Sequence, residues 1–334
     1  MTLTISRHRI DSPMIPSVCI ILLAYNQASY IEQTLDSIFS QDYPNISVLL
    51  SDDCSSDTTY DIMIKYAKQK GDRVKVRLNR NENTLGVVAH FNKAVRLIDE
   101  KYIIYQAGDD ISRSDRVSKL IDVLSKNPEL TFVESNYVEF STGMPEPYCR
   151  KMPTIKDAEP LPVSFFSGED YLARMVHLSS STRAFRKSAV LKFPDLNPML
   201  PSEDSCTAMR LFYTGNGAKV NLPLLYKRIH DSNVTGPNNL KRMNFDVFRK
   251  QYEQDAEFAH KLNIISREGC DKIKKWALRT TKRRQLRLLF DYDRPSIYDL
   301  IGKVIPSKYL NLQEKMYAIR CYFFAFEVRT REYL

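Results

Sequence analysis

Two adjacent carboxylates, Asp109 and Asp110, follow the apolar run 102–105 directly. Like charges at the end of a buried strand repel each other unless a positive group compensates them. A hard divalent cation such as Mg²⁺ or Mn²⁺, bridging to substrate phosphates, is the usual partner of such a pair. Because ligands of open α/β sheets bind at the carboxyl ends of the strands, segment 106–110 predicts a metal–diphosphate site. The alternative is a solvated turn that caps the next helix.

Three other segments carry polar residues of the same kind. Asp52 and Asp53 open the segment DDCSSDT at 52–58, just after the apolar run 46–50, and Glu203 and Asp204 open a predicted helix. Capping of a helix is the alternative for both acidic pairs, because carboxylates are favoured at a helix N-terminus. His230 lies in the segment YKRIHDSN at 226–233, where a structural role is the alternative. The remaining histidines have no assigned role.

Alternating strands and helices must position these residues. Apolar runs predict strands at 18–23, 46–50, 74–78, 102–105 and 130–140, and a further strand near 181–185. Amphipathic spacing predicts helices from residue 31 to about 43 and at 58–70, 86–98, 116–126 and 169–176. This order predicts an α/β fold with a doubly wound, mostly parallel sheet flanked by helices. Five prolines between 145 and 162 predict a long loop or lid at 143–165.

Composition narrows the class of protein. The chain of 334 residues is 43% hydrophobic and 27% charged, which is typical of a globular protein. The net charge of +9 lies entirely in residues 236–334, which hold 21 basic and 12 acidic side chains. No signal peptide precedes the first strand, and the six cysteines show no disulfide or zinc spacing, so we expect a cytoplasmic protein with reduced thiols.

Over roughly residues 16–235 the ordered motifs resemble glycosyltransferase family 2, whose members have the GT-A fold. The dipeptide YN at 25–26 follows the first strand, and LDSI at 35–38 precedes Gln41. DDCSSDT at 52–58 is similar to the second-strand signature of the family, and Asn83 and Gly86 precede Asn92 on the next helix. The pairs 109–110 and 203–204 and the segment 226–233 complete the series.

The resemblance implies a nucleotide-diphosphate sugar donor, and the residues favour uridine. The carboxylate of Asp53 can accept a hydrogen bond from the imide N–H of uracil, whereas cytosine offers only an acceptor at that position. The aromatic ring of Tyr25 can stack on the base. The predicted donor contacts are Ala24, Tyr25, Asn26, Asp53, Asn83 and Asp109, the last of them to the ribose.

The resemblance also implies roles for the remaining acids. Asp110 would hold Mn²⁺ or Mg²⁺, with His230 as a further metal or phosphate ligand. Members of the family invert the anomeric carbon, so one carboxylate must take the proton of the acceptor hydroxyl. Asp204 is the predicted base, and Glu203 would orient it or bind the acceptor. The acceptor is expected to be a saccharide or a lipid-linked oligosaccharide in bacterial capsule, lipopolysaccharide or other surface polysaccharide synthesis.

The expected organisation is a leader at 1–16, a catalytic domain at 17–236 and a basic helical region at 237–334. Within the catalytic domain, the donor half is 17–111 and the acceptor half 112–236. The basic region either packs on the catalytic domain or a second subunit, or docks on anionic lipid at the inner face of the membrane. Nucleic acid is not an expected partner, since no recognised binding module accompanies the charge.

Other function classes fit less well. The processive-synthase signature Gln-x-x-Arg-Trp is absent, which favours transfer of a single sugar. A dehydrogenase would need a G-x-G-x-x-G loop after the first strand, and a nucleotidyltransferase would need a glycine-rich phosphate loop. A non-catalytic nucleotide-sugar sensor or scaffold on the same fold is the second hypothesis, and the presence of Asp53, Asp110 and Asp204 disfavours it.

Overall fold

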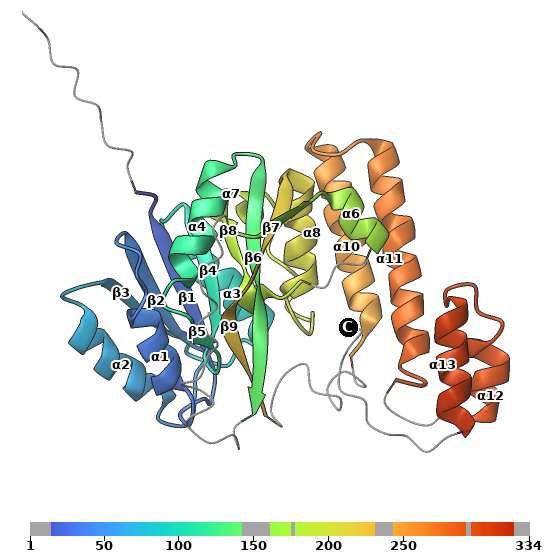
Figure 1. Ribbon diagram of the computed structural model, residues 1–334, viewed down its shortest axis with the longest axis horizontal. Helices are drawn as coiled ribbons and strands as arrows, with labels where there is room; N and C mark the ends of the chain where they lie inside the picture. The colour runs from blue at the N-terminus through green and yellow to red at the C-terminus, as the bar shows by residue number, and fades with distance from the viewer. Residues whose placement is uncertain (1–14, 142–160, 175–177, 231–242, 292–294, 324–334) are drawn as a thin grey trace, which may run out of the picture.

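The computed structural model describes residues 15–141, 161–174, 178–230, 243–291 and 295–323 (Figure 1). Most of the predicted loop at 143–165, the predicted boundary at 236–237 and most of the leader lie outside these ranges. The described part forms one twisted sheet with helices on both faces, followed by further helices at the C-terminal side. The predicted α/β fold with a mostly parallel sheet is confirmed.

The N-terminal half of the sheet is parallel. Its strands are β1 (Val18–Ala24), β2 (Ile46–Asp52), β3 (Lys75–Arg80) and β4 (Tyr102–Ala107), in the spatial order β3-β2-β1-β4. Helices α1 (Ile31–Phe39), α2 (Thr59–Lys70) and α3 (Val87–Arg96) connect them. Each of these elements was predicted, because apolar runs alternate with amphipathic segments. The carboxyl ends of β1, β2 and β4 therefore meet at one edge.

The other half of the sheet is mixed. Strands β8 (Ala184–Arg186), β6 (Leu130–Ser141) and β9 (Asn216–Ile229) follow β4, with β5 (Ile111–Ser112) and β7 (Val163–Phe166) both paired to β9. The predicted strand near 181–185 is replaced by the 3₁₀ turn η1 (Ser180–Thr182) and the short β8. The long strand β9 was not predicted, because Pro223 and Gly217 interrupt its sequence. Its pairing with β6 shifts register where Asn136 faces Pro223.

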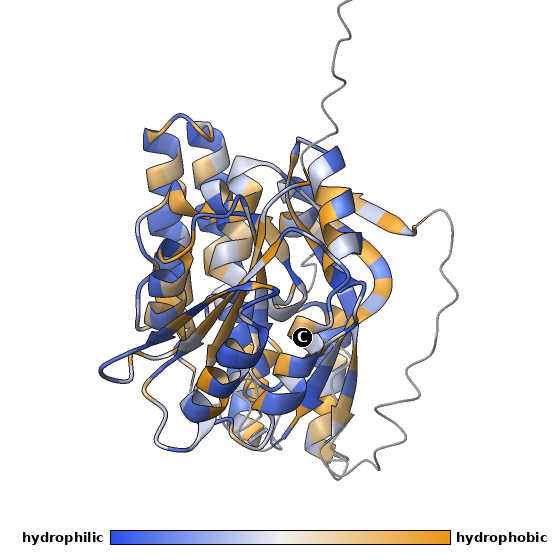
Figure 2. Ribbon diagram, turned by 90° about the vertical axis from the view of Figure 1, so that its left-hand side faces the viewer, coloured by the Kyte–Doolittle hydropathy of each residue, from blue (hydrophilic) through white to orange (hydrophobic). Residues whose placement is uncertain are grey.

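Side chains alternate between the two faces of β1, so the sheet has a separate core on each side. Ile20 and Leu22 pack against α1, α2 and α4 (Arg116–Lys126), whereas Cys19 and Ile21 pack against α3 and α8 (Asp204–Thr214). Figure 2 shows hydrophobic residues in the central strands, while hydrophilic and hydrophobic residues alternate along the helices. The remaining helices on this part of the chain are α6 (Gly168–Arg174) and α7 (Lys187–Leu191).

Two long helices, α10 (Phe245–Lys261) and α11 (Arg267–Arg287), extend the core that contains α8. Phe248, Tyr252 and Ala277 are buried in that core together with Met209 of α8. A salt bridge of 2.7 Å between the buried side chains of Arg210 and Asp255 joins α8 to α10. The first part of the basic helical region therefore packs on the catalytic sheet, one of the two packing arrangements that the sequence predicts.

The chain then forms a small helical hairpin from α12 (Ile297–Asp299), the π-helical turn η2 (Leu300–Val304) and α13 (Leu312–Phe323). Its own core contains Phe290, Leu300, Val304, Leu310 and Ala318.

Within the described residues, no helix has both the length and the apolar character needed to span a bilayer.

Candidate active site

The loops that follow β1 and β2 are tied together by hydrogen bonds at the carboxyl edge of the sheet. Ser55 and Asp57 of the segment 52–58 and the adjacent Thr59 accept bonds from backbone N–H groups of the loop after β1. The bonds between the two loops include Asn26 N to Ser55 Oγ (2.9 Å), Gln27 N to Thr59 Oγ1 (2.8 Å), Ala28 N to Asp57 Oδ2 (3.0 Å) and Ser56 N to Asn26 Oδ1 (2.8 Å). Tyr25 stays half-exposed at the tip, so its ring is accessible to a ligand.

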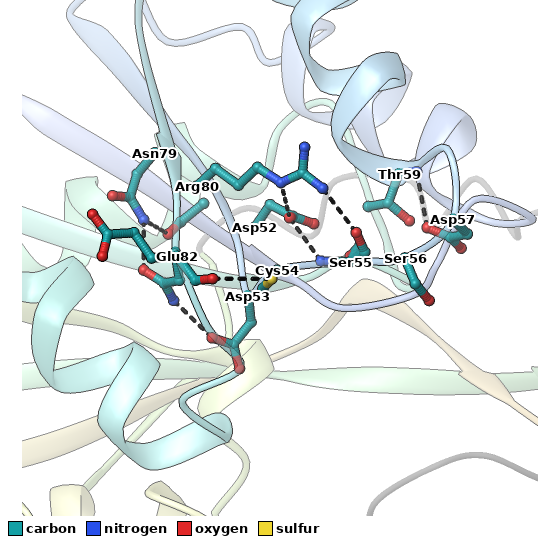
Figure 3. Close-up of polar contacts among 12 residues, drawn as sticks. Asp52, Asp53, Cys54, Ser55, Ser56, Asp57, Thr59, Asn79, Arg80 and Glu82 are labelled. Atoms are coloured by element: carbon teal, nitrogen blue, oxygen red, sulfur yellow. Dashed lines mark hydrogen bonds and ion pairs between the residues drawn. The ribbon is translucent and has the colours of Figure 1, made fainter.

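Asp52 and Asp53 point to opposite sides of their strand end (Figure 3). The Oδ2 atom of Asp52 accepts a hydrogen bond from Ser55 N at 2.9 Å and lies 3.5 Å from Nε of Arg80. This side chain is fully buried, so its function is to shape the loop rather than to contact a ligand.

Asp53 organises the loop that precedes α3. Its Oδ1 atom accepts hydrogen bonds from Asn81 Nδ2 at 2.7 Å and from Leu85 N at 2.9 Å, and its Oδ2 atom accepts one from Gly86 N at 2.9 Å. A carboxylate has about four acceptor positions, so one remains for a base. If Asp53 contacts uracil, these three hydrogen bonds already hold its carboxylate in place.

A second layer of polar residues supports this loop. Lys93 Nζ donates to Asn81 Oδ1 at 2.7 Å, and Asn81 in turn donates to Asp53. Asn83, the predicted donor contact, follows Asn81 by two positions and is exposed. Among the described residues, its side chain makes no hydrogen bond to Asp53. Asn81 was not predicted, although its place between two polar residues at a strand end was a usable signal.

Asp109 and Asp110 follow β4 as predicted, and the end of β9 covers them. Nε2 of His230 lies 2.9 Å from Oδ2 of Asp109, and the backbone N of Arg228 donates to Oδ1 of Asp110 at 3.0 Å. The side chain of Arg228 donates to the carbonyl of Asp109 at 3.0 Å and to Oε1 of Gln33 at 2.6 Å. The structure thus pairs His230 with Asp109, whereas the sequence analysis grouped it with Asp110.

Burial, followed by the negative charge of Asp109, raises the pKa of Asp110 to about 7. Both carboxylates are buried, so the pair is costly in the charged state unless a cation joins it. Within the described ranges no three acidic, histidine or cysteine side chains are grouped to hold a metal. A cation at Asp110 would therefore have few protein ligands and would take most of its oxygen ligands from substrate phosphates and water.

The second acidic pair sits at the start of α8 and is held by a single serine. Ser180 N donates to Asp204 Oδ1 at 2.6 Å, and Ser180 Oγ donates to Glu203 Oε1 at 2.7 Å. Burial, together with the charge of Asp204, raises the pKa of Glu203 to about 7. Asp204 is less buried than Glu203, so it is the more accessible of the two. Ser180 was not predicted, because only the folded chain brings it to α8.

Strand β4 and the turn η1 connect the two acidic pairs, because Tyr105 N donates to the carbonyl of Arg183 at 3.3 Å and Ser180 of η1 binds Glu203 and Asp204. Burial, and then the charges of the four carboxylates at 203, 204, 109 and 110, raise the pKa of Tyr105 well above its ordinary value. Four carboxylates can act on one phenol only if both pairs are close to it, since charge interactions weaken with distance. The two pairs, 94 residues apart in the chain, therefore belong to one acidic site.

A buried ion pair supports the second acidic pair. Nε and Nη2 of Arg183 donate to Oε1 of Glu134 at 2.9 and 2.7 Å, and both side chains are almost fully buried. Arg183 also donates to the backbone carbonyl of Asp204 at 3.3 Å. Removing one member would leave the other charge buried without compensation. Because Arg183 also bonds to the carbonyl of Asp204, the ion pair helps to hold the start of α8 in place.

The mostly parallel sheet with helices on both faces has the architecture of the GT-A fold. A structure of TarS from S. aureus in complex with UDP-GlcNAc resembles the chain with a TM-score of 0.53 at 15% identity, covering 92% of this chain and 89% of that one. The model of Glycosyl transferase family 2 matches residues 19–192, and the chain belongs to that family.

The curated relatives EpsE and WfaP each match little more than a third of the chain. The putative glycosyltransferase EpsE of Bacillus subtilis is 32% identical over 125 residues, which are 37% of this chain and 44% of EpsE. A β-1,3-glucosyltransferase of Escherichia coli, WfaP, whose name gives UDP-glucose as donor and a GlcNAc-diphosphoundecaprenol as acceptor, is 30% identical over 120 residues. These are 36% of this chain and 45% of WfaP, so the match covers less than half of either relative.

Proposed function

We propose that the protein is a metal-dependent inverting glycosyltransferase that moves one sugar from a nucleotide-diphosphate sugar, UDP-linked in the first instance, to an acceptor hydroxyl. The observation that carries the proposal is that the two acidic pairs are close together: one follows β4, and the other is held by Ser180 on the segment that bonds to β4 through Tyr105 N and the carbonyl of Arg183. The first pair lies beside the loop after β1, where Gly108 approaches Gln27, and the second opens α8, so the donor would bind at the first pair and the acceptor at the second.

The donor residues have distinct tasks in this proposal. Tyr25, half-exposed, would stack on the base, and the remaining acceptor position of Asp53 would take the imide N–H of uracil. Asp109 would bind the ribose and keep His230 oriented. Asp110, with Asp109 and His230 beside it, would hold Mn²⁺ or Mg²⁺, which when bound supplies positive charge for the diphosphate.

Asp204 would act as the base. Its carboxylate takes the proton of the acceptor hydroxyl while that oxygen bonds to the anomeric carbon, and the bond from this carbon to the diphosphate oxygen breaks. Ser180 N holds Oδ1 of Asp204, which leaves Oδ2 for the acceptor. Glu203, more deeply buried, would keep the adjacent carboxylate in position through the shared contact with Ser180.

The setting of the reaction follows from the relatives. We infer an acceptor that is a saccharide or a lipid-linked oligosaccharide, as the name of WfaP states for that enzyme, and a role in bacterial surface polysaccharide synthesis. A lipid-linked acceptor would bring a cytoplasmic enzyme to the inner face of the membrane.

Thermal shifts with UDP, GDP, CDP and dTDP, each with and without Mn²⁺, test the donor site. Ligand at 100 times its Kd stabilises the native state by about 2.7 kcal/mol, which is readily measured. We expect a shift with UDP that requires Mn²⁺ and that is lost in Asp110→Ala. Asp195→Ala, which removes an exposed carboxylate on the surface, is the matched control and should keep the shift. Normal Mn²⁺-dependent binding by Asp110→Ala would refute the metal assignment, and no shift with any nucleotide would favour a scaffold protein.

A further inference from the structure

The C-terminal hairpin exposes one apolar face. Leu300 and Val304 on its first arm pack toward Ala318 of α13, and these residues form the inside of the hairpin. The exposed apolar side chains recur at helical spacing on each arm. They are Ile297, Tyr298, Ile301 and Ile305 on the first arm, and Leu312, Met316 and Phe323 on α13.

The two apolar rows lie on the same side of the hairpin. On the first arm, Ile301 and Ile305 each follow an inward-facing residue by one position, and on α13 Phe323 follows the partly buried Tyr322 in the same way. One position is a rotation of about 100° about a helix axis, in the same sense on both arms. Because the arms of a hairpin run in opposite directions, equal rotations turn both rows to one side. The exposed apolar side chains of both arms, such as Leu312 at 76%, therefore face the same side of the hairpin.

A row of basic side chains runs along the outward face of α11. Lys272, Lys275, Arg279 and Lys282 are exposed at i, i+3, i+7 and i+10, opposite the core residue Ala277. Helix α11 contains nine basic and two acidic residues in all. Lys282 also lines an open hollow of about 610 Å³ whose other wall is the hairpin, with Lys303, Lys308 and Tyr309 among its lining residues.

The basic row and the apolar face belong to one rigid arrangement. Leu286 and Leu289, which follow the basic row along the chain, pack against the core of the hairpin. Nε of Arg283 lies 2.8 Å from Oε1 of Glu314 on α13, which adds an ion pair between the two elements. The hairpin is thus mounted at the end of the same helix that carries the basic row.

We propose that this surface docks the protein on a bilayer that contains anionic phospholipid. The apolar face enters the boundary between headgroups and acyl chains, and the basic row of α11 pairs with lipid phosphates. Amphipathic helices that bind membranes in this way combine apolar side chains on one face with lysine and arginine beside them. A second copy of the chain is a poorer occupant, because it would bring two strongly basic helices together.

Flotation of the full chain with lipid vesicles tests the proposal. Vesicles of phosphatidylcholine alone are compared with vesicles that also contain phosphatidylglycerol, at low and high salt. We expect binding to the anionic vesicles, with little binding to the neutral ones. Binding should weaken with salt, because ions screen the basic row. The donor thermal shift is measured on every variant, so folding and donor chemistry are scored independently of vesicle binding.

Charge variants test the basic row. A triple substitution of exposed residues on α11 should lower the partition coefficient on anionic vesicles by roughly 100-fold, since each basic residue near such a surface contributes about fivefold. The control removes the same charge from exposed positions near β3. The test variant is Lys275→Gln, Arg279→Gln and Lys282→Gln, and the control is Lys68→Gln, Arg73→Gln and Lys75→Gln.

Apolar variants test the hairpin. Serine at three exposed positions should reduce vesicle binding by at least about tenfold, because the substitutions remove apolar area that would enter the membrane. The donor thermal shift should be kept. The control places serine at three exposed apolar positions elsewhere on the protein. The test variant is Ile301→Ser, Leu312→Ser and Met316→Ser, and the control is Leu97→Ser, Met199→Ser and Leu262→Ser.

Three results would overturn the proposal. The first is failure of the full chain to float with anionic vesicles while its donor thermal shift is normal. The second is equal binding by the test variants and their controls. The third is self-association that only the hairpin variant abolishes, which would show that the apolar face is an interface between copies. Loss of the donor shift together with normal flotation would instead count against the proposed transferase and leave the docking surface standing.

Discussion

Replacing Glu203 by glutamine is expected to stabilise the protein above pH 7 and to leave its stability nearly unchanged near pH 4. The side chain is only 2% exposed, and it lies next to another carboxylate, Asp204. Glutamine keeps an oxygen to accept the hydrogen bond from Ser180 Oγ, which is 2.7 Å long, and removes the charge. The substitution therefore isolates the cost of ionising a buried acid.

The magnitude follows from the pKa of Glu203, which burial and then the charge of Asp204 raise from an ordinary value of 4.5 to about 7. At 1.36 kcal/mol for each pKa unit, this difference corresponds to about 3 kcal/mol. The unfolded chain loses this proton near pH 4.5 and the folded chain near pH 7, so wild-type stability falls as the pH rises between these values. The full cost is present above pH 7, and Glu203→Gln removes it.

Urea unfolding between pH 4 and 8 measures this difference. Trp276, the only tryptophan, packs against Tyr171 and Tyr252 in the core, so its fluorescence reports unfolding. Glu169→Gln, at an exposed surface ion pair, is the control and should change stability by less than about 1 kcal/mol at every pH. The reasoning is refuted if Glu203→Gln is no more stable than wild type at pH 8, or if its advantage is the same at pH 4.

Three other substitutions test separate parts of the structure. Asp204→Asn should keep the donor thermal shift but lose sugar transfer by about 100-fold or more, and normal transfer would show that this acid only caps α8. Gly108→Ala should weaken donor binding and lower the melting temperature, because a Cβ there would displace the side chain of Gln27 and lie 3.0 Å from Cβ of Ala24, which cannot rotate away. An unchanged melting temperature would contradict this. Arg210→Ala should cost about 3–5 kcal/mol in urea unfolding by leaving Asp255 buried without its partner, whereas a loss below about 1 kcal/mol would mean that α10 is not part of the core.

The sequence by itself determined the parallel half of the sheet and the positions of both acidic pairs. The strands β1, β2 and β4 are continuous apolar runs, as strands buried on both faces must be, and their boundaries depend on residues close in the chain. The segment 52–58 was equally readable, since the side chains of Ser55 and Asp57, with the adjacent Thr59, bond to backbone N–H groups of a neighbouring loop. Local patterns specify such elements almost completely.

The tertiary structure decided what those residues contact. Strand β9 is broken in sequence by Gly217 and Pro223, yet it forms because β6 pairs with it and because the ring of Phe132 occupies the space where a Cβ on Gly217 would lie. That strand brings His230 to Asp109 across 121 residues. Asn81, which was not predicted, bonds to Asp53, whereas Asn83, the predicted donor contact, is exposed. The spacing of the two asparagines does not show which side chain points toward Asp53.

The same distinction applies to the acids themselves. Their order in the chain was visible, but the raised pKa of Glu203 depends on burial under segments that are distant in sequence, and the contact with Ser180 spans 23 residues. The basic charge of the C-terminal region was likewise evident, whereas only packing showed that α10 and α11 complete the core while the hairpin keeps an apolar face exposed. Composition gives the number of charged and apolar side chains in a chain. The fold decides which of these side chains remain at the surface, because burial depends on neighbours from every part of the chain.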